Sequence, residues 1–282
     1  MEDFGECEVC RTNTSSRFVY SKGGCDILVC NWCRTGRAVT SAFRPEHYYT
    51  KEYFQGGHAD GYADYEASEP GLNKEFANTL GFLTQFEPSG RLLEIGCAYG
   101  NFLRVAAKKF DVYGVEISEH AADRCRQYGL RVLQGAVSRE LLAEFDMFDV
   151  CVLLDVIEHL ESPERSLSMI AEKLKVGGHL LLTTGDFGSA FARASGKRWR
   201  LMTPPQHLWF FTQTGIRMLA RRVGLEVVAI DHPWKRVPIG LIVYQVSRNF
   251  TSRLTAPAFL NHLSIPVNLF DAMRVVLRKT SQ

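Results

Sequence analysis

The chain changes its pattern of apolar and polar positions along its length. The first forty residues hold two short strand-like runs, and helical spacing appears later at Leu72, Phe76, Leu80 and Leu83. After that point, short apolar runs alternate with segments in which apolar residues recur every three or four positions. The pattern indicates a small N-terminal module followed by a larger domain of alternating strands and helices.

Seven apolar runs in the larger domain are predicted strands. They cover residues 91–95, 112–116, 131–133, 148–154, 179–184, 226–230 and 272–277. Helices are expected at residues 101–110, 119–128, 163–174 and 213–223, with Ser118 and Thr212 as N-caps. This alternation predicts an α/β fold with a Rossmann-like, doubly wound, mainly parallel seven-stranded sheet. Ligands of such sheets bind beyond the carboxyl ends of the strands.

Four cysteines in the N-terminal module form two C-x-x-C pairs. The pairs are Cys7 with Cys10 and Cys30 with Cys33, and the strands expected at 17–20 and 26–29 would bring them together. Two such pairs are typical of a tetrahedral zinc site, and four thiolates leave no open position on the metal. We therefore predict a structural Zn²⁺ in a small zinc ribbon. The alternative is two pairs of buried or redox-active cysteines, but the βαβ pattern that usually accompanies a redox pair is absent.

The chain thus divides into three predicted parts. Residues 1–40 form the zinc ribbon, and residues 41–90 an aromatic linker and helix that cover part of the active site. Residues 91–282 form the α/β domain, with an insertion at 232–268 before the last strand. The insertion is long enough to be a lid, a homodimer surface or a membrane contact.

Charge is distributed unevenly, although the formal net charge is only +2. From residue 187 to the end there are 14 Lys or Arg against three acids, so this part carries +11 and the remainder −9. The C-terminal third is therefore the place to look for an anionic partner. The ribbon has five basic and five acidic residues, a balance that disfavours a phosphate-binding surface.

The N-terminus is acidic, and no apolar run is long enough to span a bilayer. We therefore expect a cytoplasmic location, where cysteines serve as thiols or metal ligands rather than disulfides.

A glycine-containing loop follows the first strand of the α/β domain. Residues 94–100 read Glu-Ile-Gly-Cys-Ala-Tyr-Gly, and Gly96 and Gly100 would allow a sharp turn close to a ligand. The next strand ends at Glu116, a position where an acid suits the two hydroxyls of a ribose. The alternatives are that Glu94 only caps the loop and that Glu116 is a solvated strand end.

These residues resemble the class I S-adenosylmethionine (SAM)-dependent methyltransferases, in particular the ubiquinone-biosynthesis-like branch. The family's acid-x-Gly-x-Gly-x-Gly motif matches Glu94, Gly96 and Gly100, with Ala98 in place of the middle glycine. Residues 148–160 and 199–212 match further landmarks, and the resemblance covers roughly residues 45–282. It implies SAM as the cofactor. The expected cofactor-binding residues are Glu94, Gly96, Cys97, Gly100, Glu116, Ile117 and Ala136.

Three side chains are candidates for chemistry at the transferred methyl group. His159 follows the fourth strand, where a general base or substrate ligand would lie, although it could instead cap the loop before Pro163. His207 lies in an aromatic loop that would face the same region. Asp155 would contact the methionine end of the cofactor or orient His159.

The substrate-side candidates are Arg198, Trp199, Arg200 and Tyr62. The arginines lie in a segment, residues 187–225, that has seven basic residues and no acids, so they could bind a phosphate or carboxylate. Tyr53, Phe54, Tyr62 and Tyr65 would form a lid over the sulfonium or serve only in packing.

The leading hypothesis is methyl transfer from SAM to a small metabolite or sugar derivative, with a phosphorylated or otherwise anionic substrate as one option. A second hypothesis is an RNA methyltransferase whose ribbon binds RNA; nucleic acid is the less favoured partner. A third is a non-catalytic SAM-binding or zinc scaffold protein. The sequence does not identify the acceptor molecule, the acceptor atom or the oligomeric state.

Overall fold

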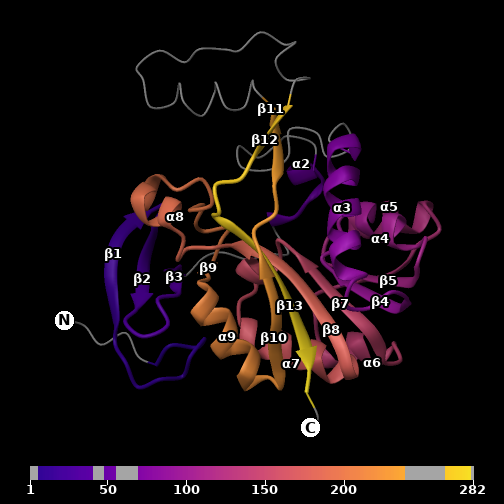
Figure 1. Cartoon of the computed structure of the whole chain (residues 1–282), viewed down its shortest axis with the longest axis horizontal. Helices are drawn as coiled ribbons and strands as arrows, with labels where there is room; N and C mark the ends of the chain where they lie inside the picture. Colours follow the sequence, from indigo (N-terminus) through magenta and orange to yellow (C-terminus); the bar gives the residue numbers. More distant parts are fainter. Residues whose placement is uncertain (1–5, 41–47, 55–68, 239–263, 281–282) are drawn as a thin grey trace.

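A single seven-stranded sheet forms the centre of the α/β domain (Figure 1). The computed structural model describes residues 6–40, 48–54, 69–238 and 264–280. The strands of this sheet are β4 (Gly90–Ile95), β5 (Phe110–Glu116), β6 (Arg131–Gln134), β7 (Phe148–Leu154), β8 (Leu174–Gly185), β10 (Leu225–Asp231) and β13 (Ala272–Lys279). Their order is β10-β13-β8-β7-β4-β5-β6, and β13 runs antiparallel to both of its neighbours. The predicted Rossmann-like, doubly wound sheet is confirmed.

The direction of winding reverses beside β4. From β4 the chain proceeds outward through β5 and β6, then returns to add β7 and β8 on the other side. The loops after the adjacent strands β4 and β7 therefore lead to opposite faces of the sheet. This topological switch point is where doubly wound sheets place their ligands.

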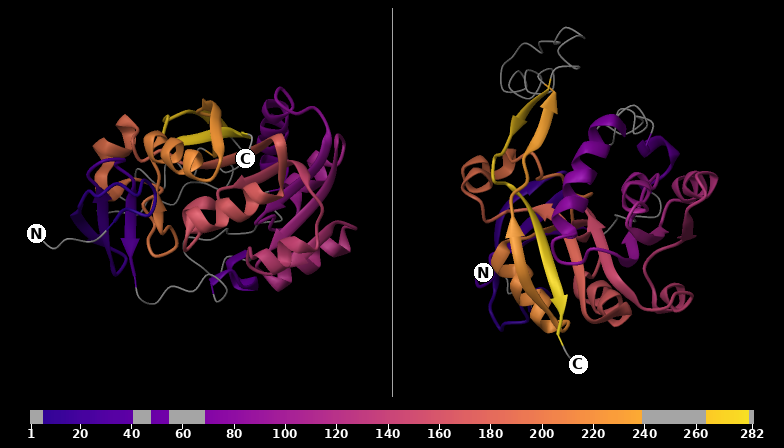
Figure 2. Two further views of the ribbon diagram at one scale, coloured as in Figure 1. Left: turned by 90° about the horizontal axis from the view of Figure 1, so that it is seen from below. Right: turned by 45° about the vertical axis from the view of Figure 1, so that its right-hand side comes forward.

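Helices cover both faces of the sheet, giving three layers (Figures 1 and 2). The helices on one face are α3 (Glu69–Leu83), α4 (Asn101–Ala106) and α5 (Glu119–Gln127), and those on the other are α6 (Arg139–Ala143), α7 (Pro163–Lys173) and α9 (Gln213–Arg222). Alternate residues of one strand supply the two cores. Leu181 of β8 packs with the first set, whereas Leu180 and Leu182 pack with the second.

Two local predictions need qualification. The helix expected at residues 101–110 ends at Ala106, because Phe110 is already buried in β5 and pairs with Gly90. Thr212 caps α9 by accepting a hydrogen bond from the Gly215 amide. Ser118 occupies the N-cap position of α5, but its side chain makes no capping bond.

The N-terminal module contains more than the predicted hairpin. β1 (Ser16–Lys22) and β2 (Cys25–Cys30) are the expected strands, and β3 (Gly36–Val39) extends their sheet. A fourth strand, β9 (Trp209–Phe210), comes from the α/β domain and pairs with β3 (Figure 1). Because Val9 and Leu208 belong to one hydrophobic cluster with the α/β core, the small sheet and the large domain share their packing.

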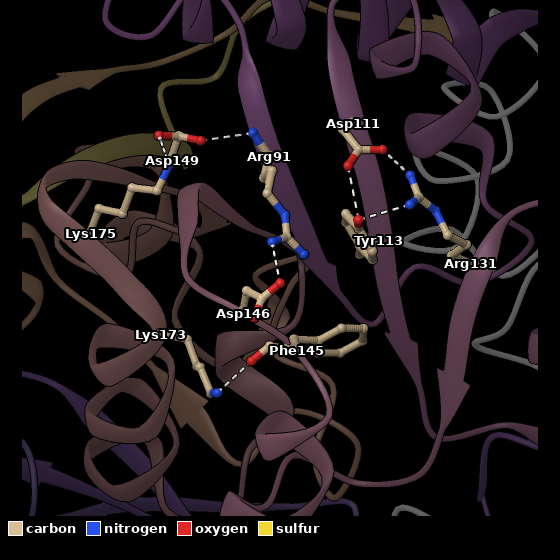
Figure 3. Close-up of polar contacts among 9 residues, drawn as sticks. All are labelled: Arg91, Asp111, Tyr113, Arg131, Phe145, Asp146, Asp149, Lys173 and Lys175. Atoms are coloured by element: carbon tan, nitrogen blue, oxygen red, sulfur yellow. Dashed lines mark hydrogen bonds and ion pairs between the residues drawn. The ribbon is translucent and has the colours of Figure 1, made fainter.

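Polar contacts tie the amino ends of the central strands together (Figure 3). Asp149 at the start of β7 accepts a 2.8 Å hydrogen bond from the Arg91 backbone amide and forms a 2.7 Å ion pair with Lys175. The Arg91 guanidinium forms a 2.8 Å ion pair with Asp146. These residues lie at the sheet edge opposite the carboxyl ends of the strands, so they stabilise the frame and leave the other edge for ligands.

Short elements connect and extend this frame. They are α2 (Lys51–Phe54), η1 (Ile157–His159), α8 (Ala190–Ser195) and η2 (Gly196–Arg198). In the expected insertion, β11 (Lys235–Pro238) pairs with β12 (Ser264–Val267) and projects beyond the main sheet (Figure 1). Residues 239–263 lie outside the described residues, so the choice between lid, dimer surface and membrane contact stays a prediction. Within the described ranges, no helix combines the length and apolar character needed to cross a bilayer.

Candidate functional site

A cavity of about 1010 Å³ opens at the carboxyl edge of the sheet, at the switch point. The ends of β4, β5, β7 and β8 form its floor, and residues 48–54 and 200–207 contribute to its walls. This volume is at the upper end of the range for ligand pockets, so the cavity has room for a cofactor and a small second molecule.

Glu94 provides an unusual carboxyl group at the cavity wall. Its side chain lies at the end of β4 and is 3% exposed. Among the described residues, nothing hydrogen-bonds its Oε2 atom. Burial raises the pKa of this carboxyl well above its ordinary value. A buried polar atom without a partner is costly, so the position fits a ligand that supplies a cationic hydrogen-bond donor.

Glu116 holds the neighbouring loop in place. Its Oε2 accepts a 2.8 Å hydrogen bond from the Ala98 amide, and its Oε1 accepts one of 2.8 Å from the Ser118 amide. Burial raises the pKa of Glu116, and these amide hydrogen bonds partly offset the effect. The carboxylate therefore fixes the loop after β4 against the end of β5 while still facing the cavity.

The loop after β4 depends on left-handed backbone conformations. Gly96 and Gly100 have φ values of +72° and +71°, and Ala98 has a φ of +48°. A side chain in this region is strained, which explains the family's preference for glycine where this chain has Ala98.

The predicted cofactor residues do not all face the cavity. Cys97, Ile117 and Ala136 line it, as do Glu94, Gly96 and Glu116. Gly100 is not among the lining residues; a Cβ atom there would lie 2.3 Å from Cδ1 of Leu130. Its left-handed φ and the close approach of Leu130 both favour glycine at this position. The buried carboxyl of Glu94, the loop and the acid ending β5 together fit SAM, whose ammonium group and ribose hydroxyls would meet these acids.

Two imidazoles meet on the other side of the cavity. The ring centroids of His159 and His207 are 4.7 Å apart, and Nδ1 of His159 lies 2.8 Å from the Gln206 carbonyl oxygen. Because a carbonyl can only accept, this nitrogen carries a proton. Burial lowers the pKa of His159 and lowers that of His207 to about 3, so both rings are neutral at neutral pH. The ligand atoms of Glu158 and the two histidines lie within 4.8 Å of one another, close enough to engage one small group or a cation together.

Asp155 follows β7 at the cavity wall, beside these imidazoles. Thr183 donates a 2.9 Å hydrogen bond from its hydroxyl to Oδ1 of Asp155 and accepts one from the Asp155 amide. Asp155 also has a φ of +53°, so its backbone is held in a strained conformation next to the site.

An aromatic wall closes the cavity near residues 48–54. Tyr49, Tyr53 and Phe54 line it, and the ring of Phe54 stacks on Tyr99 at 4.9 Å. The Tyr49 hydroxyl is buried and has no hydrogen-bond partner among the described residues. Burial raises the pKa of this phenol, so it stays protonated and can donate. Tyr62 and Tyr65, the other predicted lid residues, lie outside the described residues.

Of the three predicted substrate residues that the structure describes, only Arg200 lines the cavity. Its guanidinium makes two hydrogen bonds to Asp271, of 2.9 and 3.0 Å. Trp199 is 1% exposed and donates a 2.9 Å bond from Nε1 to the same carboxylate. Arg198 lies in η2 and is not among the lining residues.

Three further residues, Tyr49, Thr203 and Gln206, line the cavity without belonging to the predicted site residues. Thr203 Oγ1 is a second buried hydroxyl with no hydrogen-bond partner in the described part of the chain. All three lie in segments that are distant from the glycine-containing loop in sequence. The sequence feature that could have predicted Thr203 and Gln206 as site residues is the occurrence of polar residues among prolines and aromatics in residues 203–211.

The four ribbon cysteines converge as predicted. All are buried, with Sγ–Sγ distances of 3.8 Å between Cys7 and Cys33 and 3.7 Å between Cys10 and Cys30. Zinc–sulfur bonds of about 2.3 Å in a tetrahedron require sulfur atoms about 3.8 Å apart. The cluster therefore has the dimensions of a closed four-thiolate metal site. All eight cysteines of the chain are described, and none of them forms a disulfide.

Comparison with known proteins gives consistent matches. A family profile described as "Methyltransferase domain" matches residues 67–230. A ubiquinone biosynthesis O-methyltransferase of Cereibacter sphaeroides is 31% identical over 150 residues, which cover 49% of this chain and 61% of that protein. The match therefore spans about three-fifths of the relative's length.

Solved structures share the fold at low sequence identity. Magnesium protoporphyrin IX methyltransferase from Synechocystis, solved with bound S-adenosylhomocysteine (SAH), superposes with a TM-score of 0.53 at 14% identity. The match covers 83% of this chain and 98% of that one. A SAM-dependent methyltransferase from Archaeoglobus fulgidus gives a TM-score of 0.52 at 16% identity, covering 76% and 99%.

Proposed function

Because this chain belongs to the class I SAM-dependent methyltransferase family, we propose that it transfers the SAM methyl group to a small, hydroxyl-bearing metabolite or sugar derivative. The buried carboxyl of Glu94 at the wall of the cavity carries the proposal, because no described residue hydrogen-bonds its Oε2 atom. Bound SAM supplies an activated methyl on a sulfonium. All other chemistry falls to side chains of this chain.

The cofactor would occupy the side of the cavity formed by β4, β5 and β6. Glu94 would accept hydrogen bonds from the SAM ammonium, and Glu116 would accept them from the ribose hydroxyls. Ile117 and Ala136, which line the cavity, would provide apolar and backbone surface for the adenine. Each acid therefore has a distinct partner in the ligand.

The acceptor would lie between the aromatic wall and the two imidazoles. The hydroxyls of Tyr49 and Thr203 are available to hydrogen-bond and orient it. The neutral imidazole of His207 would accept the hydrogen bond of the acceptor hydroxyl and take its proton as the methyl is transferred, with His159, fixed by the Gln206 carbonyl, beside it. This proton transfer is favourable at that moment because the site loses one positive charge from sulfur as the imidazole gains one.

The charge of the cavity narrows the choice of acceptor. Seven acids line it (Glu75, Glu94, Glu116, Glu140, Asp155, Glu158, Glu161), against three arginines (Arg139, Arg165, Arg200). This excess suits a cationic cofactor and disfavours a polyanion such as RNA. If the acceptor is anionic, its charged group would bind Arg200, although the ion pair with Asp271 already neutralises much of the charge of that guanidinium.

The ribbon cluster is proposed to hold one structural Zn²⁺. Four buried thiolates would be mutually repulsive without a cation, and their spacing matches a closed tetrahedral site. Metal analysis of protein purified without chelator should give one zinc per chain, and Cys30→Ser should lose it. A wild-type preparation without zinc would refute this part.

Two measurements test the catalytic proposal together. The first is calorimetry with SAM, and the second is transfer of labelled methyl from SAM to a small-molecule extract or to total RNA. We expect binding, with label in the small-molecule fraction only. Label in RNA would support the second hypothesis, and binding without transfer to either fraction would support a scaffold. His207→Gln should bind SAM normally and lose most of the transfer.

A further inference from the structure

The segment that carries His207 forms much of the acceptor side of the cavity. Thr203, Gln206 and His207 all line it. This segment, residues 203–212, has little regular structure of its own, and its one strand is the two-residue β9. Its position must therefore come from contacts with other parts of the chain.

Leu208, directly after His207, is held from two sides. Its carbonyl oxygen accepts a 2.8 Å hydrogen bond from the Ala38 amide of the N-terminal sheet. Its amide donates a 2.9 Å bond to the carbonyl of Glu158 in η1. The next two residues continue the pairing with β3. The backbone of this one residue thus links the N-terminal sheet to the turn that carries His159.

The β1–β2 turn presses on the same segment at a second point. Gly23 has a φ of +58°, and a Cβ atom there would lie 2.3 Å from the carbonyl oxygen of Pro204. Because the neighbour is backbone, a side chain at Gly23 would displace the segment rather than rotate a flexible group. Gly24 has a similar φ of +74°, but a Cβ atom there would meet nothing within 4 Å.

A cysteine turn supplies the third contact. The Thr212 hydroxyl donates a 2.7 Å hydrogen bond to the carbonyl oxygen of Cys33 and accepts one of 3.0 Å from the Gly215 amide. Thr212 therefore joins the metal-site turn to the start of α9, at the end of the segment. The contacts at Pro204, Leu208 and Thr212 flank His207 on both sides.

We propose that the N-terminal sheet is a positioning element for the acceptor side of the cavity, in which Gly23, Ala38 and Cys33 fix the segment that carries His207. The inference rests on the proposed function for its catalytic meaning. The cofactor side has different supports, since Glu116 anchors its loop through the amides of Ala98 and Ser118. Disturbing the N-terminal sheet should therefore change the acceptor side of the cavity and leave SAM binding unchanged.

The matched pair Gly23→Ala and Gly24→Ala tests this directly. Both variants place alanine in a left-handed conformation at a similar cost, but only the first collides with Pro204. We expect Gly23→Ala to shift the imidazole NMR signals of His159 and His207 and to speed amide exchange at Leu208 by about tenfold or more. Its SAM affinity should stay within about twofold, with unchanged metal content. Gly24→Ala should change none of these readouts.

A second pair covers the case in which Gly23→Ala fails to fold. Thr212→Val removes the hydroxyl that reaches Cys33, whereas Thr212→Ser retains it. The valine variant should shift the same imidazole signals, and the serine variant should restore them.

Three outcomes would overturn the positioning role. The first is that Gly23→Ala and Gly24→Ala have the same imidazole signals and the same amide exchange at Leu208. The second is that Gly23→Ala loses SAM binding together with the shift of its histidine signals. The third is that Thr212→Val gives the same imidazole signals as the wild type. If wild-type protein does not bind SAM, the proposed function fails. The comparison at Leu208 would still decide the positioning role.

Discussion

The imidazole rings of His159 and His207 lie nearly perpendicular, at an interplanar angle of 82°, with their centroids 4.7 Å apart. One follows β7 and the other precedes β9, so the fold brings together residues from two distant segments. The Gln206 carbonyl, bonded to His159, belongs to the residue next to His207, which makes the two rings one structural unit.

This unit predicts a stability change with pH. Both imidazoles have a pKa below the value of about 6.5 expected in the unfolded chain, and that of His207 is about 3. Below pH 6.5 the unfolded chain therefore binds protons that the folded chain does not. The contribution of these two rings to the free energy of unfolding should fall as the pH falls, by at most about 1.4 kcal/mol per pH unit for each ring. Denaturant unfolding at pH 7.5 and 5.5 measures the change, and His207→Gln should reduce it. An equal pH dependence in the variant and the wild type would contradict the assignment.

Glu94 predicts that SAM binding releases a proton. In the free protein, burial raises the pKa of this carboxyl, whereas a bound ammonium would favour its ionised form and lower that pKa. Affinity for SAM should therefore rise with pH between the pKa of Glu94 in the bound protein and its pKa in the free protein. Calorimetry in two buffers with different ionisation enthalpies should show proton release that disappears in Glu94→Gln. Identical binding enthalpies in the two buffers would argue against an ammonium at this position.

The conformation of Ala98 predicts that a glycine substitution here costs less stability than one at Ala107. Its φ of +48° is costly for a side chain, so Ala98→Gly relieves strain that offsets the added flexibility of the unfolded chain. Ala107 at the end of α4 has a φ of −56°, where Ala107→Gly should cost about 0.5–1 kcal/mol. Thermal unfolding of the two variants checks the difference. A larger loss at position 98 than at position 107 would show that the alanine is not strained.

Much of the fold could be predicted because its elements have local signals. Residues 148–154 form a continuous apolar run, and the strand occupies the same residues. The C-x-x-C spacing likewise predicted the convergence of the four cysteines. Phe110 shows the limit, since its apolar character fits either the end of a helix or the start of a strand. Pairing with Gly90 decides in favour of the strand.

Parts of the site could not be predicted because they depend on contacts distant in sequence. Trp199 and Arg200 are adjacent in the sequence, yet Asp271 holds one within the core and the other at the cavity wall. The hydroxyls of Tyr49 and Thr203 lack a hydrogen-bond partner among the described residues, and this becomes notable only once the cavity encloses them. The pairing of β9 with β3 likewise joins residues about 170 positions apart, for which no local pattern exists.

The central claim is that two acids at the carboxyl ends of β4 and β5 bind SAM, and calorimetry on three charge-removing variants tests it. Glu94→Gln and Glu116→Gln should each weaken SAM binding by about 10- to 100-fold, since each loses a hydrogen bond to a charged group worth about 1.5–3 kcal/mol. Asp149→Asn, at the opposite edge of the sheet, should keep wild-type affinity. Unchanged affinity in both glutamine variants, with all three proteins folded, would contradict the account.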